Sequence, residues 1–252
     1  MPLWQYAVIA VAGMLAGMIN AVVGSGTLIT FPVLLAFHYP PVVANVSNGL
    51  GLVPGSVAGA YGYRRELEGQ RPRLIKLGIA SALGAIVGAV LLLKLPADAF
   101  QAVVPVLIVI ALVLVVIQPW LARKVAARRQ EGHSGDGGFL LLLGIFATGV
   151  YGGYFGAAQG VIAIGIMGVL LNESMQRINA SKNVLTALAN LVSGVVFIVV
   201  AHVAWIAVGL IAAGSMIGGL IGARIGRKLP PIALRAVIVV VGLVAIGKLV
   251  LT

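Results

Sequence analysis

The chain of 252 residues is 61% hydrophobic and only 9% charged. Soluble domains carry roughly 25% charged residues, so this composition excludes a soluble globular protein and predicts a membrane protein. The formal net charge of +11 lies mostly in short loops between apolar runs, as the positive-inside rule describes, which argues against a nucleic-acid partner. The absence of cysteine excludes disulfides and thiolate metal sites.

Apolar runs separated by breaks divide the chain into ten predicted helical segments. Lipid offers the backbone no hydrogen bonds, so long apolar runs without alternation predict helices. The segments cover residues 3–23, 27–38, 42–62, 74–93, 99–120, 138–156, 159–171, 178–200, 203–223 and 231–251. Eight of them reach the roughly 20 residues that a bilayer requires. The second and seventh have only about 12 residues, a rise of about 18 Å, and are predicted to be half-helices in hairpins that turn at glycine-rich breaks.

Self-comparison indicates that the chain consists of two related halves. The matches between the first and second half are Gly17 with Gly149, Gly24 with Gly156, Asn48 with Asn183, Gly84 with Gly218 and Gly88 with Gly222. Lys-Leu-Pro follows the last pair of glycines in each half, and matches in the same order indicate a duplication. We therefore expect a first repeat at residues 1–122, a basic cytoplasmic linker at 123–137 and a second repeat at 138–252.

Basic clusters predict how the two halves cross the membrane. Each half has five segments, so the halves run in opposite senses if every segment changes side. The clusters are Arg64, Arg65, Arg71, Arg73 and Lys76; Arg123, Lys124, Arg128 and Arg129; and Arg224, Arg227, Lys228 and Arg235. All follow odd-numbered segments, and the positive-inside rule assigns that side to the cytoplasm. We expect a multi-pass protein of the bacterial inner membrane with cytoplasmic basic loops, both termini outside, and a first segment retained as a helix.

The expected fold class is an all-α polytopic membrane protein of two inverted repeats, with eight full spans and two half-helices. Inverted repeats with broken helices are typical of secondary transporters, which bind their cargo at the midplane where the broken ends meet. The first break is Gly24-Ser25-Gly26-Thr27, and the second break covers residues 156–160. Such a turn can bind an anion through its N–H groups or let two helices touch. We expect Gly24 and Gly26 to form the turn and Ser25 and Thr27 to face an anion.

Polar residues near the breaks form the predicted substrate site. The predicted substrate-binding residues are Asn20, Ser25, Gly26, Thr27, Asn45, Ser47, Asn48, Gln159, Gly160, Lys182 and Asn183. A cation transporter would need a buried carboxylate, but no Asp or Glu falls inside a predicted span. Lys182, helix N-termini and amides suit an anion instead.

Other roles for these polar residues stay open. Each amide could simply join two helices. Lys182, placed in the first turn of the segment 178–200, could extend to the membrane interface. His38 and His202 end their segments beside aromatic residues, and either could relay protons or lie at the interface.

These residues resemble the TauE/SafE, or sulfite exporter-like, family of membrane permeases. The resemblance covers the full length. It rests on Gly17, the first break and Ala44-Asn45-Val46-Ser47, and on Gly149, the second break and Asn179-Ala180-Ser181. The family usually has longer glycine runs at both breaks, where this chain places Ser25, Thr27, Ala157, Ala158 and Gln159. The resemblance implies a small sulfur-containing anion as cargo, such as sulfite, thiosulfate or an organosulfonate like sulfoacetate.

The function expected is secondary transport of such an anion by alternating access around a midplane site. An anion channel and a non-transporting membrane subunit are the alternatives. An enzyme is not expected, because the chain lacks cysteine, intramembrane acids and paired histidines from which a nucleophile or metal centre could be built. No cofactor or metal is expected. The expected partners are the small anion and the lipid bilayer, with a homodimer left open.

Overall fold

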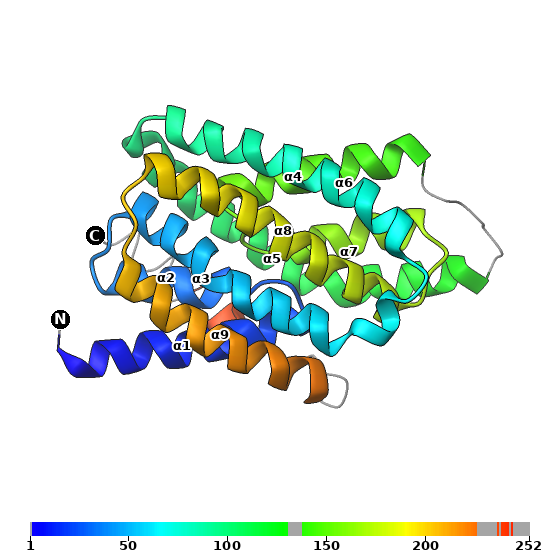
Figure 1. Ribbon diagram of the computed structural model, residues 1–252, viewed down its shortest axis with the longest axis horizontal. Helices are drawn as coiled ribbons and strands as arrows, with labels where there is room; N and C mark the ends of the chain where they lie inside the picture. Colours follow the sequence, from blue (N-terminus) through cyan, green and yellow to red (C-terminus); the bar gives the residue numbers. More distant parts are fainter. Residues whose placement is uncertain (1, 131–137, 226–235, 237, 242, 244–252) are drawn as a thin grey trace.

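The computed structural model describes residues 2–130, 138–225, 236, 238–241 and 243 (Figure 1). Every regular element of this part is a helix. The elements are α1 Leu3–Val22, α2 Thr27–Ala36, α3 Pro41–Gly62, the short 3-10 helix η1 Arg64–Leu67, α4 Arg71–Lys94, α5 Ala97–Gln130, α6 Gly138–Tyr154, α7 Gln159–Leu170, α8 Met175–Val200 and α9 Trp205–Ile225. Nine of the ten predicted segments coincide with α1 to α9, and most of the tenth lies outside the described residues.

Among the helix boundaries that differ from the prediction, two have clear local physical reasons. α5 continues to Gln130, eight residues into the expected linker, because residues 123–130 are mainly Ala, Arg, Lys and Gln, which favour helix. α8 begins at Met175, since the Ser174 hydroxyl accepts a hydrogen bond from the Arg177 N–H at 3.3 Å and caps the helix. The placement of Lys182 in the first turn was therefore wrong, because two turns of helix precede it.

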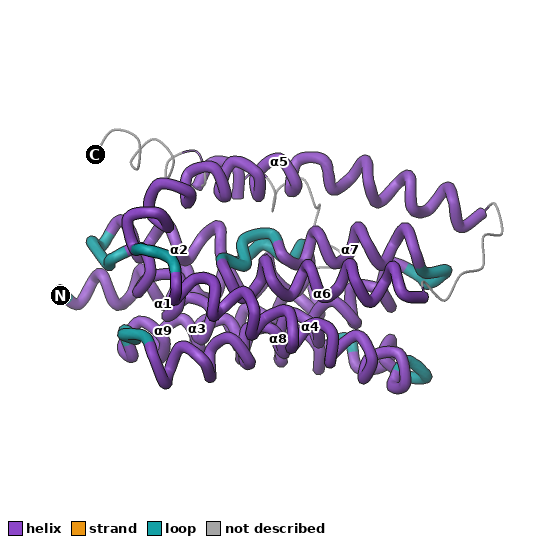
Figure 2. Tube along the Cα trace, turned by 90° about the horizontal axis from the view of Figure 1, so that it is seen from above, coloured by secondary structure: helices purple, strands orange, loops and turns teal. Residues whose placement is uncertain are grey.

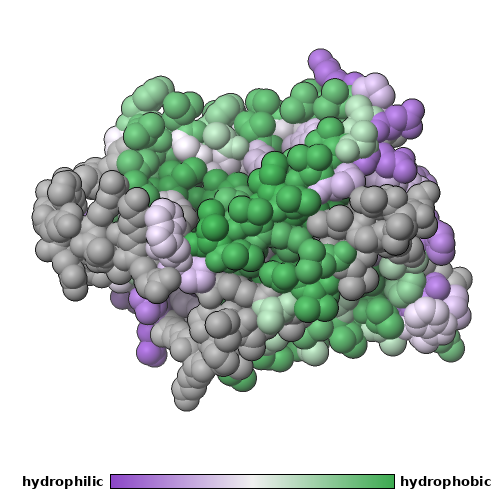
Figure 3. Space-filling model, turned by 180° about the vertical axis from the view of Figure 1, so that it is seen from behind, coloured by the Kyte–Doolittle hydropathy of each residue, from purple (hydrophilic) through white to green (hydrophobic). Residues whose placement is uncertain are grey.

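The helices are those of a membrane protein. Five described helices, α1, α4, α5, α8 and α9, are long and apolar enough to cross a bilayer, while α2 and α7 are short as predicted. α3 has 22 residues but carries several amides and hydroxyls, and α6 has 17 residues. Large apolar side chains cover the outward faces of the bundle, as Figure 3 shows for one side. The prediction of an all-α, multi-pass membrane protein is confirmed, and the inverted orientation of the halves stays a prediction.

Glycines let the longest helices cross backbone to backbone. Gly84 and Gly88 of α4 lie against the backbone of α6, and Gly218 and Gly222 of α9 lie against the backbone of α1. No side chain fits at such a crossing, which is how small residues allow membrane helices to pack closely. These are the glycines that match between the halves of the sequence, so the two crossings agree with a duplication.

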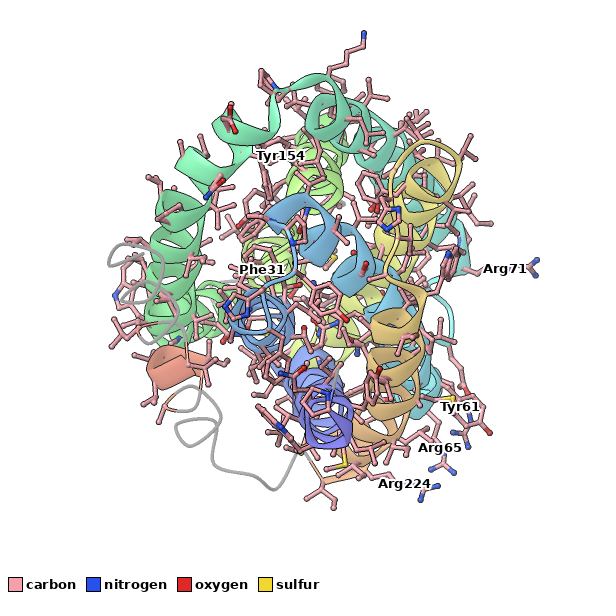
Figure 4. All side chains as sticks on the ribbon, turned by 90° about the vertical axis from the view of Figure 1, so that its left-hand side faces the viewer. Phe31, Tyr61, Arg65, Arg71, Tyr154 and Arg224 are labelled. Carbon is pink, nitrogen blue, oxygen red and sulfur yellow. The ribbon has the colours of Figure 1, made fainter. Side chains whose placement is uncertain are left out.

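The basic ends of the helices gather at one end of the bundle. In Figure 1 the α3–α4 connection and the C-terminal ends of α5 and α9 lie toward the end opposite the start of α1. Figure 4 shows the side chains of Arg65 and Arg224 extending outward on the same side of the bundle. Arg227, Lys228 and Arg235 lie outside the described residues. The assignment of this end to the cytoplasm stays a prediction.

Candidate functional site

Two helices end midway through the bundle in matching glycine turns. Gly24 follows α1 with φ +89° and Gly156 follows α6 with φ +77°. Each donates its N–H to the carbonyl five residues earlier, Gly24 to Ile19 at 3.2 Å and Gly156 to Tyr151 at 3.0 Å, as helix-ending glycines do. α2 and α7 begin three residues later, and loop segments beside the start of α7 lie midway along the bundle (Figure 2). The predicted hairpins of half-helices are present.

The two breaks contact each other through their backbones. The Gly160 N–H donates to the Gly24 carbonyl at 3.0 Å. A methyl group on Gly24 would lie 2.6 Å from the Cα of Gly160, so this contact requires glycine. The N-terminal ends of α2 and α7, with no acidic residue in either first turn, therefore start near one another. The positive ends of two helix dipoles meet there.

Lys182 lies against this contact with its side chain fully buried. Its Nζ donates to the Asn20 carbonyl at 2.6 Å and to the Ala21 carbonyl at 3.3 Å. Both carbonyls belong to the last turn of α1 and have no partner within the helix. The ammonium does not extend to the membrane interface, so that alternative is wrong. An ammonium has three N–H bonds, and one is left beyond the two contacts described.

No acidic side chain is buried in the described part of the chain, so Lys182 has no buried anionic partner there. Its aliphatic stem packs against Gly160, where a Cβ atom would lie 2.7 Å from the lysine Cδ. The site therefore places a lysine amine between two helix N-termini. When protonated, such a group is costly to bury unless an anion or several dipoles compensate it.

Asparagines of α3 and α8 donate to the ends of α6 and α1. Asn45 Nδ2 donates to the Tyr154 carbonyl at 2.9 Å, and Asn179 Nδ2 donates to the Ala21 carbonyl at 3.0 Å. These contacts pair Asn45 with Asn179, whereas the sequence match paired Asn48 with Asn183. The predicted site left Asn179 out, although Asn179 and Ser181 repeat the spacing of Asn45 and Ser47.

Asn183 also belongs to this group, and its Nδ2 donates to the Ala21 carbonyl at 3.3 Å. Because the side-chain Nδ2 atoms of Asn179 and Asn183 both face the Ala21 carbonyl, the orientations of these two side-chain amides are fixed. Their Oδ1 atoms are buried without a hydrogen-bond partner, as is the Ser25 hydroxyl. The site thus contains the amine of Lys182, which has one N–H beyond its two described contacts. It also contains three oxygens without hydrogen-bond partners, namely the Ser25 hydroxyl and the two asparagine Oδ1 atoms.

Four other predicted residues hold the first hairpin to α3. Asn20 Nδ2 donates to Ser56 Oγ at 2.9 Å, and the Gly26 N–H lies 3.5 Å from Asn20 Oδ1. Asn48 Nδ2 donates to Thr27 Oγ1 at 3.1 Å, and the Thr30 hydroxyl donates to Asn48 Oδ1. The described contacts of Asn20, Thr27 and Asn48 are therefore those of residues that join helices.

The remaining predicted residues contact or form the start of a helix. Ser47 Oγ accepts from the Ala204 N–H at 2.9 Å, just before α9 begins. Gln159 begins α7 and is buried, with its amide against Gly152. His38 and His202, in the α2–α3 and α8–α9 connections, are exposed and lie outside the site.

Side chains that the predicted site left out satisfy other carbonyls at the breaks. Gln118 Nε2 of α5 donates to the Val23 carbonyl at 3.4 Å, and the Tyr151 hydroxyl donates to the Ala157 carbonyl at 2.6 Å. Phe31 and Phe155 pack edge to face with ring centroids 5.2 Å apart beside the breaks. Every residue has a backbone carbonyl, so the sequence does not show which carbonyls accept these hydrogen bonds.

A cluster of charges joins the two halves at the basic end. Glu173, before α8, bonds Arg73 of α4 at 2.8 Å and Arg177 at 2.6 Å. Arg177 also donates to the Glu68 carbonyl at 3.1 Å. Burial raises the pKa of Glu173, but the hydrogen bonds from Arg73 and Arg177 outweigh it and hold the pKa below its ordinary value.

Comparison with known proteins identifies the family. The family model described as Sulfite exporter TauE/SafE matches residues 9–249. The chain is 29% identical over 242 residues to "Probable membrane transporter protein YfcA" of Escherichia coli (strain K12), covering 94% of this chain and 86% of that protein. It is 25% identical over 247 residues to a "Probable membrane transporter protein" of Haemophilus influenzae, covering 97% and 94%.

A third relative is the "Probable membrane transporter protein YdhB" of Bacillus subtilis (strain 168), 28% identical over 228 residues that cover 90% of this chain and 91% of that protein. No solved structure matches the chain. Because the family match extends over almost all of the multi-helical membrane bundle, the chain belongs to the TauE/SafE family of membrane transport proteins.

Proposed function

We propose that the protein carries a small anion across the membrane by alternating access between two inverted halves. The observation that supports this most is Lys182, a fully buried cation with no buried acid in the described part of the chain. An anionic cargo would supply the missing negative charge. The third N–H bond of the ammonium is then the donor that the cargo receives.

The surroundings of Lys182 suit an oxyanion. α2 and α7 direct their positive ends toward the same region, and Ser25 offers a hydroxyl without a partner. A sulfur oxyanion or an organosulfonate has several oxygens that can accept such bonds. The family description names sulfite, so sulfite, thiosulfate and sulfoacetate are the cargoes to test first. Lys182, Ser25 and the break glycines would surround the cargo.

Transport into proteoliposomes tests this function. Labelled sulfite, thiosulfate and sulfoacetate should enter vesicles that contain the protein and not empty vesicles. Lys182→Met should weaken cargo binding about tenfold or more, because a hydrogen bond to a charged group is worth about 1.5–3 kcal/mol. The readout is the rise in melting temperature that the cargo causes in each variant, relative to the same variant without cargo.

Lys94→Met is the matched control, because Lys94 is exposed at the end of α4. It should bind cargo like the unmodified protein. Equal cargo affinity in Lys182→Met would remove this residue from the site. In planar bilayers we expect no unitary current; a steady unitary current would favour an anion channel over alternating access.

A further inference from the structure

An apolar groove runs along the outside of the bundle between α4 and α8. Its volume is about 540 Å³, and its walls include Leu74, Ile79 and Ala82 of α4 and Val184 and Leu188 of α8. Beneath it the helices are tied together, because the Ser81 hydroxyl donates to the Leu185 carbonyl at 3.3 Å. The groove opens outward, where Ile75, Ile79 and Leu83 of α4 are exposed apolar side chains.

One end of the groove carries a positive charge. Arg71, the first residue of α4, lines it and is exposed. Arg73 is paired with Glu173, but within the described residues the Arg71 guanidinium contacts no acid and no hydrogen-bond acceptor. Figure 4 shows its side chain extending away from the bundle. Its planar fork of N–H donors is suited to phosphate.

The length of the groove matches one leaflet of a bilayer. From Arg71 to Ala82 the helix rises about 16 Å at 1.5 Å per residue, and half of a hydrocarbon core of about 30 Å is about 15 Å. The charged end lies where the basic residues of the chain gather. An acyl chain in the groove would therefore bring its phosphate to the level of Arg71.

A second groove provides a comparison within the same molecule. It has a volume of about 440 Å³ and lies between α5, α6 and α7, with Leu114, Leu140, Val169 and Leu170 among its walls. All of its lining residues are apolar or glycine. A lipid chain could lie there without any selection of its headgroup.

We propose that the α4–α8 groove is a binding site for one anionic phospholipid, with an acyl chain along α4 and the phosphate on Arg71. The lipid would lie at the contact between the two halves of the chain. It would press on the outer side of α8, whose inner side carries Lys182. The proposal does not depend on which cargo the protein moves.

Native mass spectrometry of the purified protein tests the headgroup. The protein should retain one phosphatidylglycerol more tightly than phosphatidylcholine. Arg71→Gln should weaken phosphatidylglycerol binding about fivefold, the effect of about 1 kcal/mol for one arginine at a membrane surface. Lys94→Gln, at the opposite end of the same helix, should change nothing. Equal losses in both variants, or equal retention of the two lipids, would overturn the proposal.

Filling the groove tests the acyl chain. Ala82→Phe should remove the tightly held phosphatidylglycerol, while Val169→Phe in the second groove should leave it bound. Retention of the lipid in Ala82→Phe would refute the site. If Ala82→Phe instead converts a dimer to a monomer without changing the lipid count, the groove is a contact between two copies of the chain and the lipid proposal is wrong.

Discussion

At the scale of single residues, the amides at the breaks serve helix ends whose carbonyls lack intrahelical partners. The Tyr154 carbonyl has Asn45 as its described side-chain donor. The Ala21 carbonyl has three donors, from Asn179, Lys182 and Asn183. The equivalent residues Asn45 and Asn179 should therefore contribute differently to the stability of the protein.

Asn45→Ala should lower the free energy of unfolding by about 1–2 kcal/mol, because it leaves the partly buried Tyr154 carbonyl without its donor. Asn179→Ala should cost less than about 1 kcal/mol, since the Ala21 carbonyl keeps two donors and the variant loses an unpartnered Oδ1. Thermal unfolding of the detergent-solubilised variants measures the difference. A loss of unfolding free energy in Asn179→Ala that equals or exceeds the loss in Asn45→Ala would contradict this prediction.

Sequence periodicity identified most polar residues around the breaks but not their partners. Asn20, Thr27 and Asn48 are predicted at the cargo, and their described contacts join the first hairpin to α3. Sequence periodicity places a residue on one face of its helix. Which other helix packs against that face depends on how the helices cross. Gln118 was missed for the same reason, because its acceptor is a backbone carbonyl distant in sequence.

At the scale of helices, glycine positions decide how closely the elements cross. Gly84 lies against α6 and Gly218 against α1, while a Cβ atom on Gly209 of α9 would meet nothing within 4 Å. Gly84→Ala and Gly218→Ala should each destabilise the protein by about 1–3 kcal/mol through overpacking. Gly209→Ala should be neutral or stabilising by up to about 1 kcal/mol, because alanine favours helix.

Melting temperatures of the three glycine variants provide the test. A loss of melting temperature in Gly209→Ala as large as in the other two variants would mean that stability depends on the backbone freedom of glycine and not on the distance between crossing helices.

Helix positions themselves followed from the apolar runs. The start of α8 did not, because its cap, Ser174, lies in a polar stretch that the hydropathy pattern does not resolve.

At the scale of the whole molecule, Glu173 holds the start of α4 to the start of α8. Glu173→Gln should lower the free energy of unfolding at pH 7 by about 1 kcal/mol, because it weakens two partly exposed ion pairs. The folded-state pKa of Glu173 lies below the ordinary 4.5. Its stabilising effect is therefore complete above pH 4.5 and is lost as the pH falls through the lower, folded-state pKa.

Melting curves of both proteins between pH 7 and pH 3 should converge only below pH 4.5. Arg65→Gln is a suitable control, because Arg65 lies at the same end and has no described ion pair. Convergence of the melting curves already at pH 6 would show that another group controls the difference.

The sequence predicted the clustering of basic residues but not the pairing of Glu173 with Arg73, because these two residues are 100 residues apart.

The contact between Lys182 and the end of α1 has a consequence for the empty protein. Exposed carbonyls give a helix C-terminus roughly half a negative charge, and Asn20 and Ala21 offer this charge to the ammonium. Because these two contacts leave the third N–H for the cargo, the end of α1 compensates part of the lysine charge both with and without cargo. Under the proposed mechanism, a carrier with this built-in compensation can return unloaded, so net transport would not require an exchanged anion on the other side.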